Sequence, residues 1–323
     1  MKNYNTYILC ILVFIFSACE KQELPVPKHT ISNAITTSVD MSSNYQWQVY
    51  YDLETNCVVS KNYKTDWDLG FETGEDGFHV ILNTSTSMFA FCTNSSDFES
   101  VLDTNGFSVN KRWDEPSGNL DSSAIGDWRT HDKVWIIDRG YSASGSALGF
   151  KKIKLLSVSN TAYTFQCASM NNSDSETINI TKHNDYNFTF FSFNTGEEVL
   201  TIEPPKKNWD ICFTQYLHIF HNPTQPYLVT GCVSNRYKTS SAIERLSPFQ
   251  TINYTSIEHF SFSNAINSIG YDWKTYRGGL YVTDPTKVYL IKNRNNKYYK
   301  LHFIDFYSTG GSKGNPTWEY QAL

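Results

Sequence analysis

KVYLIKNRNNKYYKLHF, at residues 287–303, is the stretch of sequence that indicates the fold. Two runs rich in apolar and aromatic residues, 287–292 and 298–306, flank a polar segment at 293–297. That segment contains three asparagines, and asparagine tolerates the positive φ angles of tight turns. The pattern therefore predicts a β-hairpin.

Alternation along the second run predicts which side chains face a core. Successive residues of a strand point to opposite faces of a sheet, so Tyr299, Leu301 and Phe303 share one face. Lys300 lies on the other face, where we expect solvent. The basic residues of the stretch fall at a strand start, in the turn and on this outer face. They form no single stripe suited to phosphate groups, so the stretch is predicted to build a sheet.

Four blocks of sequence recur in the same order along the chain. The offsets between matched copies are 142, 145, 154 and 148 residues. The blocks pair residues 67–71 with 209–213, 124–130 with 268–275, 133–137 with 287–291, and 150–155 with 298–303. This spacing predicts an internal duplication of about 140–150 residues. We expect two similar antiparallel β domains, at residues 31–170 and 171–323, with a polar boundary at 171–175.

The composition also favours an all-β fold. Aromatic residues make up 15% of the chain, a share close to the 18% of charged residues. Aromatic residues are enriched in strands, and apolar residues alternate with polar ones in most of the structured segments. A helix of more than two turns is expected at one place, around residues 241–246, just before Pro248.

The N-terminus indicates export and lipid anchoring. Lys2 precedes an apolar run at residues 7–16, which is too short to span a bilayer and is typical of a signal peptide. The Ser-Ala-Cys sequence that ends at Cys19 resembles a bacterial lipobox, which implies cleavage before Cys19 and its acylation. Residues 1–18 are therefore a predicted lipoprotein signal peptide, and residues 19–30 are a predicted linker from the lipid anchor.

Charge and motifs narrow the class of function. Removing residues 1–18 takes away one charged residue, Lys2, and leaves 26 basic and 32 acidic residues, a net charge of −6. This acidic balance argues against nucleic acid as a partner. The five cysteines after Cys19 show no metal-ligand spacing, and no disulfide pairing is predicted. Motifs of hydrolases, zinc proteases and nucleotide-binding enzymes are absent from the sequence, so we predict a non-enzymatic protein.

Six short motifs of the C-terminal half form a recognisable set. They are FFSFNTG at 190–196, WDICF at 209–213, IGYDW at 269–273, KVYLI at 287–291, KYYKL at 297–301 and GNPTWEY at 314–320. This set resembles the HmuY-like family, best over residues 186–323 and more weakly, through the duplication, over residues 45–160.

HmuY-like proteins are lipoproteins of Bacteroidetes-type bacteria that are known as haem-binding or haemophore-like. The resemblance therefore implies an all-β protein anchored by lipid in the outer membrane, on its periplasmic or cell-surface side. It also implies haem, a related tetrapyrrole or a haemoprotein as ligand for iron or haem acquisition, with an outer-membrane receptor as a further partner.

The resemblance also implies candidate haem ligands. Haem iron takes axial ligands from His, Met, Tyr or Cys. His259 lies in the region where the first ligand of the family falls. The second falls near Thr275 or Tyr276, where there is no histidine; there Tyr276 can ligate ferric iron with help from Arg277. The sequence does not identify a metal-ligand pair beyond these candidates.

Two further possibilities stay open at this point. His131 of the first copy lies beside the repeated block that begins at Lys133, and it ranks below the candidates of the second copy. The alternative function is a surface binding or adhesion module for glycans or proteins that does not bind haem. Such a module would use exposed aromatic side chains, for example Trp113 and Tyr276.

Overall fold

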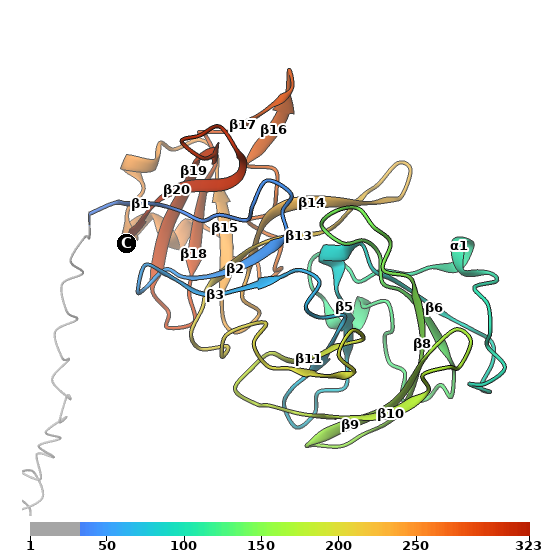
Figure 1. Ribbon diagram of the computed structural model, residues 1–323. Coiled ribbons are helices and arrows are strands. Elements are labelled where there is room, and N and C mark those ends of the chain that lie inside the picture. The colour runs from blue at the N-terminus through green and yellow to red at the C-terminus, as the bar shows by residue number, and fades with distance from the viewer. Residues whose placement is uncertain (1–32) are drawn as a thin grey trace, which may run out of the picture. The chain divides into compact units, whose positions relative to one another are not determined.

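Nearly all of the regular secondary structure is antiparallel strand, which confirms the predicted all-β fold (Figure 1). The computed structural model describes residues 33–323. The predicted signal peptide, the predicted acylation site Cys19 and the predicted linker at 19–30 lie outside these residues. Within the described residues, no helix has the length and apolar character needed to cross a membrane.

Two sheets combine the last strands of the chain with its first strands. One sheet has the order β1 (Ile35–Ser38), β20 (Lys313–Ala322), β19 (Tyr298–Tyr307), β18 (Val288–Lys292) and β15 (Ser240–Glu244). The other has the order β14 (Gln225–Ser234), β13 (Ile211–Phe220), β2 (Trp47–Asp52) and β3 (Cys57–Tyr63). We call residues 33–63 and 208–323 the second unit.

Two further sheets contain the strands in between, which we call the first unit, residues 64–207. One sheet has the order β10 (Glu176–Thr181), β9 (Ala162–Ser169), β8 (Phe150–Val158), β7 (Trp135–Asp138) and β6 (Phe89–Cys92). The other has the order β12 (Glu197–Val199), β11 (Phe188–Ser192), β4 (Leu69–Glu72) and β5 (Val80–Leu82). The first unit thus repeats the strand order of the second, as an internal duplication requires.

The chain completes the two units in different ways. In the first unit, β10 to β12 follow β9 directly along the chain, whereas the equivalent strands of the second unit, β1 to β3, come from the N-terminal side. β1 pairs with β20 and covers its edge, which an unpaired strand would leave open to association. The strand pairing therefore departs from the predicted ranges 31–170 and 171–323: residues 35–63 pair within the second unit, and residues 176–199 pair within the first.

The hairpin predicted at 287–303 is confirmed. β18 and β19 pair antiparallel, with Lys292 opposite Tyr298 across the turn, and Asn296 in the turn has a φ of 58°. Tyr299, Leu301 and Phe303 all lie in the core of the second unit, on the face that the alternation predicted.

Lys300 is buried, contrary to its predicted exposure. In each unit a loop covers the outer face of the long hairpin, and a lysine beneath it donates two hydrogen bonds to loop carbonyls. Lys300 does so in the second unit and Lys152, 148 residues earlier, in the first. The acceptors are Phe249 O (2.7 Å), Ile252 O (2.8 Å), Phe98 O (2.7 Å) and Val101 O (2.8 Å). Each buried ammonium thus satisfies carbonyl groups that would otherwise lack partners.

The helix predicted around residues 241–246 is wrong. β15 runs through this segment and pairs with β18, with Ser241 opposite Ile291. Local helix preference amounts to roughly tenths of a kcal/mol per residue, so a sheet partner decides the conformation. The helices of the described residues are short: α1 (Phe107–Asn110), η1 (Thr84–Thr86), η2 (Leu120–Ser122), η3 (Phe249–Thr251) and η4 (Tyr254–His259).

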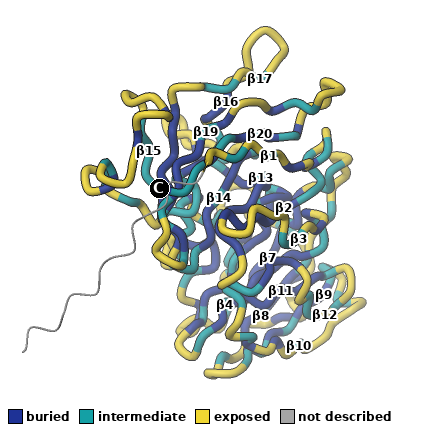
Figure 2. Tube along the Cα trace, turned by 90° about the vertical axis from the view of Figure 1, so that its left-hand side faces the viewer, coloured by how far each residue is buried: buried dark blue, intermediate teal, exposed yellow. Residues whose placement is uncertain are grey.

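Each unit has its own aromatic core. In the second unit the Trp273 ring stacks on Phe303 with a centroid distance of 3.9 Å, and Trp318 is fully buried nearby. In the first unit Trp128 and Phe165 occupy the corresponding core. A two-stranded hairpin, β16 (Lys274–Arg277) and β17 (Leu280–Thr283), extends from the second unit and is largely exposed (Figure 2).

Candidate functional site

The three residues predicted to bind haem, the ligands His259 and Tyr276 and the supporting Arg277, lie on two separate elements of the second unit. His259 is the last residue of η4 and is exposed. Tyr276 and Arg277 lie on β16, where the ring of Tyr276 contacts that of Tyr281 at a centroid distance of 5.1 Å. Among residues 33–323, no hydrogen bond, ion pair or ring contact joins His259 to Tyr276 or Arg277. Their joint role in haem binding stays a prediction.

A polar hollow of about 810 Å³ lies on the first unit. Residues of β6, β7 and the loops between them line it. They include Cys92, Arg112, Trp113, His131, Lys133 and Trp135. The hollow therefore combines one imidazole and two cations with two indole rings and with the carboxylates of Asp121 and Asp127.

The two cations of the hollow are available to a ligand. Burial raises the pKa of the Cys92 thiol, and the positive charges of Arg112 and Lys133 oppose that rise, so both cations lie near this side chain. Lys133 Nζ donates to Asn94 O at 2.8 Å. Within the described part of the chain, neither cation forms an ion pair. Guanidinium and ammonium groups without an ion-pair partner can form charge-assisted hydrogen bonds with carboxylate groups of a ligand.

His131 and Tyr276 lie at the same distance along the chain from the matched tryptophans of the two repeats. Each lies three residues after the matched tryptophan of its repeat, Trp128 or Trp273. The His131 side chain is exposed, and no side-chain hydrogen bond or ion pair engages it among residues 33–323. The offset of 145 residues between these tryptophans is the sequence signal that pairs His131 with Tyr276.

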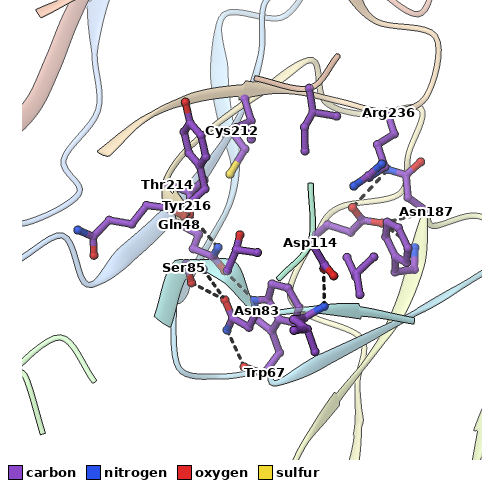
Figure 3. Close-up of a pocket in the computed structure, with 18 of the residues that line it drawn as sticks. Gln48, Trp67, Asn83, Ser85, Asp114, Asn187, Cys212, Thr214, Tyr216 and Arg236 are labelled. Atoms are coloured by element: carbon purple, nitrogen blue, oxygen red, sulfur yellow. Dashed lines mark hydrogen bonds between the residues drawn. The ribbon is translucent and has the colours of Figure 1, made fainter. Parts of the chain in front are cut away.

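A second cavity, of about 140 Å³, lies between the two units (Figure 3). Trp67, Phe188 and Phe190 of the first unit line it, together with Tyr50 and Trp209 of the second. Trp67 and Trp209 are matched residues of the duplicated Trp-Asp block. The duplication therefore places two equivalent indole rings at this cavity, which sequence reasoning did not reveal because it assigned both to the scaffold.

Two poorly solvated carboxylates line the same cavity. Glu203 accepts hydrogen bonds from the backbone N–H groups of Asn187 at 2.6 Å and Phe188 at 3.1 Å. Burial raises the pKa of Glu203 to about 7 and that of Asp114 to about 6, while the positive charge of Arg236 opposes both shifts. Both carboxyl groups thus change charge at a higher pH than they would in the unfolded chain.

The raised pKa of Glu203 predicts a loss of stability as pH rises. Between its ordinary value of 4.5 and about 7 the folded state binds more protons than the unfolded state, so the free energy of unfolding falls across this window. A shift of this size corresponds to something on the order of 3 kcal/mol. Glu203→Gln is expected to flatten the decline measured by urea unfolding from pH 4.5 to 7.5. The exposed Glu197→Gln serves as control, and an equal decline in Glu203→Gln and wild type would contradict the assignment.

The two cavities differ in their fit to haem. The cavity between the units is about the size that holds one benzene ring, and its lining includes neither His nor Met. Its Cys212 thiol is buried, which raises the pKa of that thiol far above its usual range. The hollow on the first unit has a volume in the range of ligand pockets, and beside the carboxylates of Asp121 and Asp127 it offers an imidazole and two cations, which can ligate iron and pair with propionates. The described residues contain no cluster of three or more His, Cys, Asp or Glu that could hold a bare metal ion.

Comparisons with solved structures find similar chains at low sequence identity. Among solved structures, the chain is similar to apo PinO from Porphyromonas gingivitis, with 9% identity, a TM-score of 0.31, and 90% of this chain and 98% of the other covered. It is also similar to an apo HmuY analogue from Tannerella forsythia, with 10% identity, a TM-score of 0.25, and coverages of 91% and 99%. No curated protein matches the chain.

A family model described as HmuY protein matches residues 44–187 and 227–320. The two matched segments lie in the two halves of the sequence, in agreement with the duplication. They cover well over half of the chain, and the resemblance suggested by the short motifs is thereby confirmed: the chain belongs to the HmuY family.

Proposed function

We propose that the chain is a non-enzymatic, lipid-anchored protein of the outer membrane that binds haem or a related tetrapyrrole for acquisition. The observation that carries this proposal is the hollow on the first unit, where His131, Arg112 and Lys133 are all free of ion pairs within residues 33–323. Family membership supports a binding role for the chain. Anchoring through Cys19, and transfer of the ligand to an outer-membrane receptor, belong to the same proposal.

Different residues of the hollow would contact different parts of the haem. The His131 imidazole would supply an axial ligand to the iron. Arg112 and Lys133 would pair with the propionates, because cations in a partly closed hollow form strong charge-assisted hydrogen bonds with carboxylates. The half-buried Trp113 would offer flat apolar surface to the macrocycle. Haem is the cargo here, so the task of the chain is binding and release.

Titration of residues 20–323 with haemin tests this proposal through the Soret band. Wild type is expected to shift the band at micromolar haemin, and His131→Ala is expected to weaken binding at least about tenfold, since even loss of a group that only supports a metal ligand has an effect of this size. His221→Ala is the matched control, since His221 is also an exposed histidine and lines neither cavity. Arg112→Gln is expected to weaken haemin binding while leaving the haemin dimethyl ester, which lacks free propionates, unaffected.

The other outcomes of this titration are equally informative. No shift at micromolar haemin would overturn the haem proposal while leaving the family membership intact. Loss of the shift in His259→Ala or Tyr276→Phe, with His131→Ala unchanged, would overturn the role of the hollow. It would support the site that the sequence suggested around His259, Tyr276 and Arg277.

A glycan- or protein-binding surface is the second candidate. The β16–β17 hairpin carries exposed Tyr276, Leu280 and Val282, an unusual density of apolar side chains for a projecting element. Trp113 lies in the hollow of the first unit, where its ring contacts Phe89. Among residues 33–323, no ring contact joins Trp113 to this hairpin. Retention of wild type but not Tyr276→Ser on immobilised envelope glycans, without any Soret shift, would favour this function.

A further inference from the structure

We propose that the cavity between the two units is a second binding site, for a single heteroaromatic ring that carries a hydrogen-bond acceptor. The cavity is distinct from the hollow around His131, with which it shares no lining residue. The proposal is therefore independent of haem binding.

The size and walls of the cavity select a small flat molecule. Its volume of about 140 Å³ is close to that of apolar protein cavities of roughly 150 Å³ that bind benzene. Aromatic side chains from both units form much of its lining, among them Trp67 and Phe190, which meet edge to face with a centroid distance of 4.7 Å. A planar ring can stack on or meet the edges of such walls at favourable distances.

Two buried polar groups of the lining lack partners. The Trp209 side chain is 5% exposed and Ser234 is 3% exposed, yet Trp209 Nε1 and Ser234 Oγ have no hydrogen-bond partner in the described part of the chain. By contrast, the matched indole of Trp67 donates to Gln48 Oε1 at 2.8 Å. A buried unsatisfied donor costs about 1–3 kcal/mol, so two of them at one cavity point to a bound molecule.

These groups define the chemistry of the ligand. An indole N–H only donates, so its partner has to be an acceptor. The hydroxyl of Ser234 can donate to a second lone pair or accept. The positive charge of Arg236 opposes the rise in pKa of both Asp114 and Glu203, so these three groups partly offset one another's charge in the lining. An uncharged ring that contains an acceptor atom therefore fits better than an ion.

The lining runs from the surface to the interior, since Glu115 is exposed whereas Trp209 and Cys212 are buried. Water alone is the competing occupant, and the experiment separates the two.

Pyridine and benzene are the probes, because they have the same shape and differ in the acceptor nitrogen. Binding to residues 20–323 is measured by calorimetry at millimolar concentrations, with ligand-observed NMR as a second readout. Wild type is expected to bind both and to prefer pyridine. Trp209→Phe keeps an aromatic wall but removes the N–H, so the ratio of pyridine to benzene affinity is expected to fall about three- to tenfold.

Trp318→Phe is the matched control, since it removes another unpartnered indole N–H that lies in the core of the second unit and away from the cavity. It is expected to leave the ratio unchanged. Ser234→Val supplies a second variant should Trp209→Phe fail to fold. The absence of binding by both probes, or an equal fall of the ratio in Trp318→Phe, would overturn the proposal and leave water as the occupant. Haemin binding is expected to be the same in wild type and Trp209→Phe.

Discussion

Deleting residues 33–63 is expected to unfold the second unit, although these residues belong to the N-terminal part of the sequence. The deletion removes β1, an edge strand, and β2, which lies between β13 and β3 in its sheet. It also removes five buried side chains from the core of that unit. These are Val39, Met41, Val49, Tyr51 and Leu53.

The size of this effect follows from burial. A fully buried apolar side chain contributes about 1.5–3 kcal/mol, so five of them amount to about 8–15 kcal/mol. That is as large as the whole stability of an ordinary domain, about 5–15 kcal/mol. Urea unfolding and near-ultraviolet circular dichroism of the aromatic core are the measurements, and the native signal is expected to be lost.

Addition of a synthetic peptide of residues 33–63 is expected to restore that signal, because the peptide supplies the missing strands. As control, replacing the exposed residues 276–280 by three glycines is expected to change stability by less than about 1 kcal/mol. A cooperative second unit that persists after the deletion would contradict the strand exchange. It would favour independent domains at 31–170 and 171–323.

Arg294→Met is expected to destabilise the protein by about 3–5 kcal/mol. Arg294 pairs with two carboxylates, Asp210 at 2.5 Å and Asp52 at 3.0 Å, and all three side chains are nearly inaccessible to solvent. Burial raises the pKa of Asp210 to about 6 even with the guanidinium beside it. Without Arg294 two like charges would face each other in a poorly solvated site.

Comparison with the first unit provides the control for this variant. There Arg139 pairs with Asp68 at 2.8 Å, and its second partner is the neutral Asn194 at 2.7 Å. Arg139→Met therefore leaves one carboxylate behind instead of two, and it is expected to cost less. The cost of Arg294→Met is also expected to shrink from pH 8 to pH 5, since protonation relieves the repulsion. Equal costs for both variants, measured by urea unfolding, would contradict this account.

Local pattern predicted those parts of the fold that depend on neighbouring residues. Alternation assigned Tyr299, Leu301 and Phe303 to a core because a strand turns successive side chains to opposite faces. It failed for Lys300 because the loop that covers this residue comes from about 50 residues earlier in the chain. The helix around residues 241–246 failed for a similar reason, since β18 as a partner outweighs local preference.

The candidate site was also predictable from the sequence only in part. The repeat offset pairs His131 with Tyr276. The role proposed for His131 also depends on Arg112 and Lys133, which line the same hollow and come from separate loops. The cavity between the units combines Trp67 with Trp209, which are 142 residues apart. Sequence spacing alone gives no reason for two scaffold tryptophans to line one cavity.

The sequence by itself determined the all-β class, the duplication and the family, because period-two alternation and repeated motifs are visible in the order of the residues alone. The tertiary structure alone decided which strands complete each unit, which lysines are buried and where the cavities lie. Those features depend on long-range pairing: the edge of β20 takes β1 from the far end of the described chain, and the two units meet at matched tryptophans. Such contacts gain their energy from surfaces brought together only in the folded protein.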